Sequence, residues 1–334
     1  MRISLRAAAL AFAILLGLAM VAEAQWTWTP QTGRWVNIKR MPKETAELQL
    51  EYARSLMLEG DYKKALHEVN KFAEFYGDDP LADQNQFLRA EIYMADGKLY
   101  AAAKEFQQVL SAYPATSLYD DTIAKQYEIG DRFYELGQAK LQKRWTFFRK
   151  RPLRRAIEVY AMVIDNQPFT EAAAEAQYKL GLCHHTRGEH LEAAYEYRRV
   201  IEDYAGSEWV DEASHGLATA YYDQSLPPDY DQMPSQLAIE AIDSFTVRFP
   251  NDGRGAELGE KRQEMRNNIA QQRLQSARFY EKRRQFVSAR IYYEVVVKQF
   301  PDTPAKDEAQ AWLEQNPDSG RYGPKKRRMA EQVL

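Results

Sequence analysis

Residues 47–60, ELQLEYARSLMLEG, and 61–77, DYKKALHEVNKFAEFYG, decide the fold of this chain. Apolar residues recur at helical spacing in both stretches, so each one predicts a helix. Gly60 separates them, because glycine adopts the left-handed backbone that ends a helix at little cost. Ala53 and Ala65 lie one on each helix, and their small side chains let the two backbones approach closely. The two stretches therefore predict a pair of packed helices.

The same arrangement recurs six times along the chain. The first helix of each pair carries a small residue, and a turn position follows seven residues later: Ala53 and Gly60, Ala90 and Gly97, Gly130 and Gly137, Gly181 and Gly188, Ala218 and Ser225, Ala277 and Arg284. The second helix carries an alanine and, four residues later, a bulky residue: Ala65 and Val69, Ala102 and Phe106, Ala156 and Tyr160, Ala193 and Tyr197, Ala238 and Ile242, Ala289 and Tyr293. Repetition of this kind indicates stacked supersecondary units, so we predict an all-α solenoid of about six helix pairs.

This pattern of small residues, turn positions and bulky residues resembles the tetratricopeptide repeat, and the resemblance covers about residues 44–314. It implies a right-handed superhelix of helix pairs. We expect repeat units at about 44–80, 81–118, 119–169, 170–207, 208–252 and 253–304, followed by a capping helix at 304–315 and a basic tail at 316–334.

Three departures from regular spacing predict changes in single units. Gly137 and Ala156 are 19 residues apart, so the third unit holds an insertion between its helices. The fifth unit contains the proline-bearing stretch LPPDYDQMPS at 226–235. The proline-free stretch before Ala277 predicts that the first helix of the last unit is longer by about 14 residues, or ~20 Å.

The first 24 residues resemble a secretory signal peptide. They contain a basic start, MRISLR, an apolar core, AAALAFAILLGLAMV, and the small-x-small pattern that ends at Ala24. We therefore expect a periplasmic protein after cleavage near Ala24/Gln25. Gln25 stands where a bacterial lipoprotein carries its cysteine, so we expect no acyl anchor from this signal.

Residues 25–43 form a tryptophan-rich N-terminal arm with Trp26, Trp28 and Trp35. Two interpretations are open for this arm. It is a short turn that packs on the first repeat, which we favour, or it is an arm that binds a partner, since tryptophans are common interface anchors.

Composition narrows the function classes. The chain has 45 Lys and Arg against 48 Asp and Glu, a formal net charge of −3, so nothing suggests a nucleic-acid partner. Cys183 is the single cysteine of the sequence, which excludes an internal disulfide.

The stretch LGLCHHTRGEH, with Cys183, His184, His185 and His190, is the one that suggests catalysis or metal binding. Neighbouring residues on a helix point about 100° apart, so the first three cannot face one metal together. His185 and His190 flank the turn at Gly188, with no acidic residue placed beside them. We therefore expect no catalytic, cofactor-binding or metal-binding residues, and no enzyme activity.

The insertion in the third unit, KLQKRWTFFRKRPLRR at 140–155, is basic around a core of aromatic residues. This composition suits an anionic membrane surface or an acidic partner. The alternative is a loop whose aromatic side chains fold under the solenoid. The candidate patch residues are Lys143, Arg144, Trp145, Phe147, Phe148, Arg149, Lys150 and Arg151.

The inner wall of a helix-pair solenoid is lined by the first helices of its units. Positions three before, one after and four after each small residue are expected to project there, including Leu50. The other candidates for a partner groove are Arg54, Met57, Phe87, Glu91, Met94, Tyr127, Asp131, Tyr134, Tyr178, His185, His215 and Tyr222. Aromatic and methionine side chains with scattered charges fit an extended or β-hairpin peptide.

Three features stand together in the late part of the chain: the stretch ARFYEKRRQFVSARIYYEVVVKQFPDTPAKDEAQAWL at 277–313, the long helix before it and the insertion of the fifth unit. With them, about residues 210–314 resemble the late repeats of the BamD family. It implies a non-enzymatic scaffold of outer-membrane β-barrel assembly that binds proteins of that machinery and contacts the outer membrane peripherally. The expected cysteine anchor and closing repeat of that family are missing, and at least one upstream repeat is extra.

Two other functions stay open at this stage. The chain could be a periplasmic repeat adaptor for cell-envelope division or peptidoglycan synthesis, which the missing anchor favours. It could also be an enzyme or metalloprotein built on the stretch from Cys183 to His190.

Overall fold

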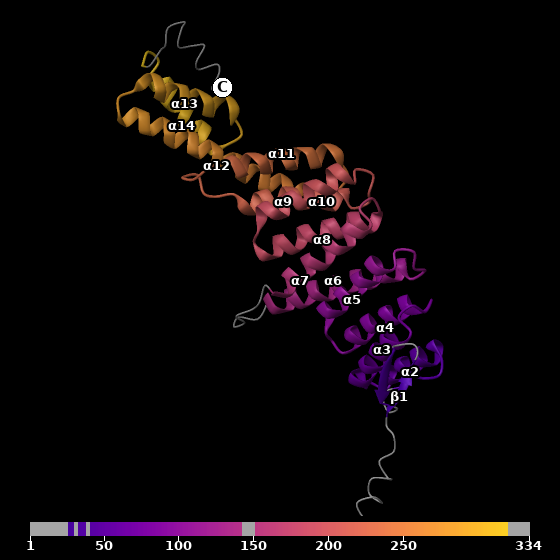
Figure 1. The fold of residues 1–334 in the computed structure, drawn as a ribbon. Helices are drawn as coiled ribbons and strands as arrows, with labels where there is room; N and C mark the ends of the chain where they lie inside the picture. Colours follow the sequence, from indigo (N-terminus) through magenta and orange to yellow (C-terminus); the bar gives the residue numbers. More distant parts are fainter. Residues whose placement is uncertain (1–25, 30–32, 38–40, 142–150, 320–334) are drawn as a thin grey trace, which may run out of the picture. The chain divides into compact units, whose positions relative to one another are not determined.

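The computed structural model describes residues 26–29, 33–37, 41–141 and 151–319. Within these ranges every element is a helix except for one short hairpin, which confirms the predicted all-α, tetratricopeptide-type class (Figure 1). The chain divides into two compact units, residues 1–129 and 130–334. Each unit has its own core of packed helices.

The first unit begins with strands β1 (Trp26–Thr29) and β2 (Arg34–Asn37), which pair antiparallel. Two helix pairs follow, α2 (Ala46–Leu58) with α3 (Tyr62–Phe75) and α4 (Ala82–Ala95) with α5 (Leu99–Ala112). Helix α6 (Tyr119–Leu141) begins in this unit and ends in the second.

In the second unit each helix from α7 to α13 packs against the next one in sequence. The helices are α7 (Arg151–Asn166), α8 (Glu171–Arg187), α9 (His190–Asp203), α10 (Val210–Gln224), α11 (Met233–Arg248), α12 (Gly255–Lys282), α13 (Phe286–Gln299) and α14 (Pro304–Gln315). Helix α10 also contacts α8 and α12, so first helices of successive pairs lie beside one another. Helix α12 has 28 residues, against 15 in α10, the first helix of the preceding pair, which confirms the predicted lengthening.

The repeated small residues lie in the cores, as the sequence predicts. All six alanines of the second helices are fully buried, and the six bulky residues that follow them are at most 2% exposed. The small residues of the first helices leave room for these knobs. A Cβ added at Gly130 would lie 2.6 Å from the ring of Tyr160, and one at Gly181 would lie 2.5 Å from the ring of Tyr197. Close packing of backbone against an aromatic ring therefore holds these two pairs together.

Three of the predicted turn glycines, Gly60, Gly97 and Gly188, have φ between 74° and 82°. Arg284 also adopts the left-handed region, with φ of 58°, although the sequence has no glycine there. The prediction of a turn at Gly137 is wrong, because α6 continues to Leu141. Gly137 is buried instead, and an added Cβ would lie 2.5 Å from the side chain of Leu153, so this glycine allows a close helix contact.

The tryptophan-rich arm forms the β-hairpin. Trp28 is the pairing partner of Trp35, and their rings meet edge to face with centroids 6.1 Å apart. Trp26, Trp28 and Trp35 are 60%, 51% and 65% exposed. The three tryptophan side chains are therefore largely exposed, and both interpretations of the arm, a turn packed on the first repeat and an arm that binds a partner, stay predictions.

Several predictions concern residues outside the described ranges. They include the signal peptide at 1–24, nearly all of the basic patch at 143–151 and the end of the basic tail at 320–334. Arg151, the last residue of that patch, is exposed at the start of α7. Among the described helices, none combines the length and the apolar character that crossing a bilayer requires.

Candidate partner-binding surface

A hollow of about 330 Å³ lies on the first helices of the first unit. Four predicted groove residues line it: Arg54 and Met57 from α2, and Phe87 and Glu91 from α4. They share one surface because α2 and α4 contact each other as first helices of successive pairs. The ring of Phe87 packs edge to face against the buried ring of Phe106, with the two ring centroids 5.2 Å apart. The structure therefore brings these four predicted residues together on one surface, and their role as a partner groove stays a prediction.

Charge inside the hollow comes from Glu91 and Arg54. Burial raises the pKa of the Glu91 carboxyl, whereas the charges of Arg54 and Lys125 lower it and that of Asp121 raises it further. A carboxylate that is partly desolvated gains from a hydrogen-bond donor brought by a ligand. The hollow therefore combines apolar side chains with one acidic and one basic group, a composition common among ligand-binding pockets.

The sequence did not identify three further lining residues, Leu58, Gln84 and Leu118. Leu58 is 77% exposed at the end of α2, and Leu118 lies just before α6, so neither occupies a face position of the repeat pattern. Their positions beside predicted helix ends were the one feature of the sequence that could have identified these two leucines. The expectation for Leu50 is wrong in part, since its side chain is buried in the unit core, although it also lines a smaller neighbouring hollow.

In the second unit the predicted groove residues mostly bond to neighbouring helices. Asp131 accepts a hydrogen bond from Tyr160 at 2.6 Å and pairs with Lys179 at 2.8 Å. Tyr178 stacks on Trp209 with ring centroids 5.3 Å apart, and burial raises its pKa to about 12. These side chains connect successive helix pairs, so they stabilise the stack.

Tyr222 and His215, both on α10, likewise face other helices. The Tyr222 hydroxyl donates to Glu264 at 2.7 Å, and this bond raises the tyrosine pKa to about 12. His215 packs against Phe245 with ring centroids 6.0 Å apart, and burial lowers its pKa. The remaining predicted groove residues, Met94, Tyr127 and Tyr134, are half-buried.

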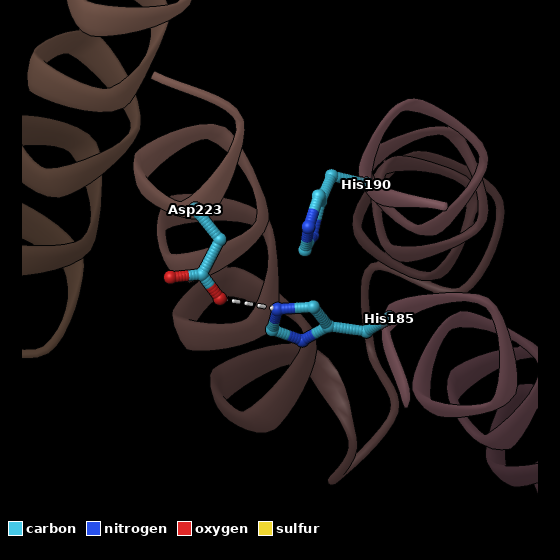
Figure 2. A group of neighbouring side chains, drawn as sticks. All are labelled: His185, His190 and Asp223. Atoms are coloured by element: carbon cyan, nitrogen blue, oxygen red, sulfur yellow. Dashed lines mark hydrogen bonds and ion pairs between the residues drawn. The ribbon is translucent and has the colours of Figure 1, made fainter. Parts of the chain in front are cut away.

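His185 lies in a cluster that the sequence did not predict. Its Nε2 is 2.7 Å from Oδ2 of Asp223 on α10, and its ring centroid is 5.3 Å from that of His190 on α9 (Figure 2). The expectation that no acidic residue accompanies these histidines is therefore wrong, because packing of α8 against α10 supplies Asp223 from 38 positions along the chain. Burial lowers the pKa of His190, and His185 lowers it further.

Cys183 and His184 take no part in this cluster. Cys183 is fully buried, and burial raises its thiol pKa to about 12, which leaves almost no nucleophilic thiolate at neutral pH. His184 Nδ1 lies 2.9 Å from Oε2 of Glu189, across the turn that ends α8. The predicted separation of Cys183 and His184 from His185 is therefore confirmed.

Comparison with known proteins places the second unit in a described family. A family model described as "YfiO: Outer membrane lipoprotein" matches residues 129–329, a wider range than the 210–314 expected from the sequence. The outer membrane protein assembly factor BamD of Caulobacter vibrioides is 22% identical over 154 residues, 46% of this chain and 50% of that protein. The chain thus spans about half the length of this curated relative.

Solved helical repeat proteins are also similar. TTC0263, a TPR protein of Thermus thermophilus, is 14% identical, with a TM-score of 0.32 over 66% of this chain and 98% of its own. YrrB, described as a TPR protein with an unusual peptide-binding site, is 17% identical, with a TM-score of 0.35 over 65% of this chain and 93% of its own.

Proposed function

The chain belongs to the YfiO family of outer membrane lipoproteins, and we propose on this basis that it is a non-enzymatic scaffold of outer-membrane β-barrel protein assembly. It acts in the periplasm, peripheral to the outer membrane, where it binds proteins of the assembly machinery or their unfolded substrates. The match of the family model over residues 129–329 is the observation that carries this proposal.

The two units contribute differently to this scaffold. The family match begins at residue 129, where the first unit ends, so the first unit is an addition to the matched region. In the second unit the candidate groove side chains bond to neighbouring helices, whereas the hollow in the first unit leaves Leu58 largely exposed. We therefore assign peptide capture to the first unit and docking to the assembly machinery to the second.

The exposed surface of Leu58 determines how much binding free energy its truncation should remove. Burial of a leucine side chain contributes about 1.5–3 kcal/mol, and Leu58 is 77% exposed before a partner covers it. Truncation to alanine should remove about 1–2 kcal/mol of binding free energy, which corresponds to a roughly 5- to 30-fold weaker complex. Because the side chain lies at the surface, the fold should lose less than about 0.5 kcal/mol.

Crosslinking in cells tests this function. A photoreactive side chain at Gln84, inside the hollow, should capture an outer-membrane protein or a barrel-assembly component that mass spectrometry identifies. Leu58→Ala should reduce that adduct several-fold. Val247→Ala is the matched control, since Val247 is 83% exposed on α11 and lies in the other unit.

Two results would contradict the proposal. Recovery of cell-wall synthases as the main adducts would favour the envelope adaptor instead. Equal yields of the Gln84 adduct in Leu58→Ala and in Val247→Ala would show that the hollow has no special role.

A further inference from the structure

Two histidines and one aspartate meet in the second unit, at a place where three helices converge. His185 lies near the end of α8, His190 is the first residue of α9, and Asp223 is the last residue but one of α10. One ligand atom from each lies within 4.8 Å of the other two. Figure 2 shows the three side chains pointing toward one another.

The backbone holds this arrangement in place. Gly188 ends α8 in the left-handed conformation, with φ of 76°, and its N–H donates to the carbonyl of His185 at 2.8 Å. The N–H of Glu189 donates to the carbonyl of His184 at 3.0 Å, so the chain reverses at once and α9 begins at His190. A left-handed glycine cap of this kind sets the spacing of the two histidines without a flexible loop.

One polar atom of the cluster lacks a hydrogen-bond partner. His190 Nδ1 is buried and has no hydrogen-bond partner within the described residues. A buried polar atom without a partner is unfavourable, so such atoms are rare unless something else satisfies them. His185 already bonds to Asp223, and neither of these two side chains forms a hydrogen bond with His190 Nδ1.

We propose that His185, His190 and Asp223 form a binding site for Zn²⁺ that joins α8, α9 and α10. Two imidazoles and one carboxylate are a ligand set that zinc accepts with a fourth position open, whereas Ca²⁺ and Mg²⁺ prefer oxygen ligands alone. All three ligands come from helices that the cores of this unit hold in place. The site is independent of the partner-binding proposal.

The side chains need only small movements to reach coordination geometry. Tetrahedral bonds of about 2.0–2.1 Å place ligand atoms about 3.3 Å apart. The His185–Asp223 contact, now 2.7 Å, therefore opens slightly, and separations of up to 4.8 Å close by about 1.5 Å. Asp223 is exposed and can supply this movement by side-chain rotation.

Zinc titration of the purified full-length chain, prepared without a polyhistidine tag and stripped with a chelator, tests the site. Competition against a zinc-sensitive dye should give one equivalent of Zn²⁺ per chain, and the melting temperature should rise with zinc. Loss of an outer-shell partner alone costs zinc sites about 10–100-fold in affinity, so loss of a ligand should cost at least as much. His190→Gln and Asp223→Asn should each show this loss and abolish the thermal shift.

Two matched variants make the result specific. His67→Ala removes an exposed histidine of the first unit, and His184→Ala removes a histidine that bonds to Glu189 outside the cluster. Both should bind zinc as the unchanged chain does. Asp223→Asn is conservative at an exposed position, so it keeps the test valid if His190→Gln fails to fold. Binding below one equivalent, or unchanged affinity in Asp223→Asn, would overturn the site.

Discussion

Tyrosine-to-phenylalanine substitutions on the second helices test the packing of the repeats most sharply. Tyr160 and Tyr197 occupy equivalent positions of successive repeats, and both are fully buried. The Tyr160 hydroxyl donates to the carboxylate of Asp131 at 2.6 Å. The Tyr197 hydroxyl is buried without a hydrogen-bond partner in the described part of the chain. The same chemical change should therefore act in opposite directions at the two sites.

The magnitudes follow from these contacts. A hydrogen bond to a charged group contributes about 1.5–3 kcal/mol, so Tyr160→Phe should destabilise the second unit by that amount. An unpaired buried hydroxyl costs about 1–3 kcal/mol, and Tyr197→Phe removes this cost. The phenylalanine leaves a void of about 10 Å³, and this void destabilises the unit by only about 0.2 kcal/mol at roughly 24 cal/mol per Å³. Tyr197→Phe should therefore stabilise the unit by about 1 kcal/mol or more.

Hydrogen exchange of backbone amides in α7 to α10 gives the most direct assay, because repeat arrays can open in parts and then have no single unfolding free energy. Urea unfolding midpoints provide a second measurement. Tyr293→Phe is an additional control, since its hydroxyl donates to Glu281 at 2.7 Å and its loss should destabilise. If Tyr197→Phe lost as much protection as Tyr160→Phe, the hydroxyl of Tyr197 would have a partner and the reasoning would be refuted.

Three further outcomes are expected. Arg284→Gly should raise stability by about 1 kcal/mol in thermal unfolding, because Arg284 is strained at φ of 58°, whereas Gly97→Ala should lower it by a similar amount at φ of 74°. Cys183 should react with a thiol-specific disulfide reagent at pH 8 only in denaturant, since burial raises its pKa to about 12, and reaction in the folded chain would contradict this burial. A hydrogen bond from Arg266 holds the pKa of Asp302 at about 2, below its unfolded value near 3.9, so its stabilisation is present above about pH 4 and lost as pH falls toward 2. In Asp302→Asn the urea unfolding midpoint should change less between about pH 4 and pH 2 than in the unchanged chain. An equal pH dependence in both chains would exclude a stabilising role for the Asp302 carboxylate.

The helix pairs were predictable from sequence because their determinants are local. Apolar periodicity predicts each helix, and the offset between Ala53 and Ala65 predicts which faces meet. The same reasoning located the lengthened α12. It misplaced a turn at Gly137, because a glycine is equally useful for ending a helix and for admitting a neighbour such as Leu153. Sequence offers no means of separating these two uses.

The candidate site was predictable only in part. Arg54 and Glu91 were found because they occupy face positions of regular repeats, whereas Leu58 was missed because it ends its helix. In the second unit the same face rule selected Tyr222, which the structure shows bonded to Glu264. The rule identifies side chains that point toward neighbouring first helices, but it cannot distinguish a contact within the chain from an open surface.

The sequence by itself determined the class of fold and the contacts of alanine and glycine within each pair, since these depend on spacings of a few residues. The tertiary structure alone decided that Asp223 reaches His185 and His190, and that a hollow remains between α2 and α4. Both results depend on how one helix pair stacks on the next. That stacking joins residues tens of positions apart through the sum of many side-chain contacts, so no local pattern encodes it.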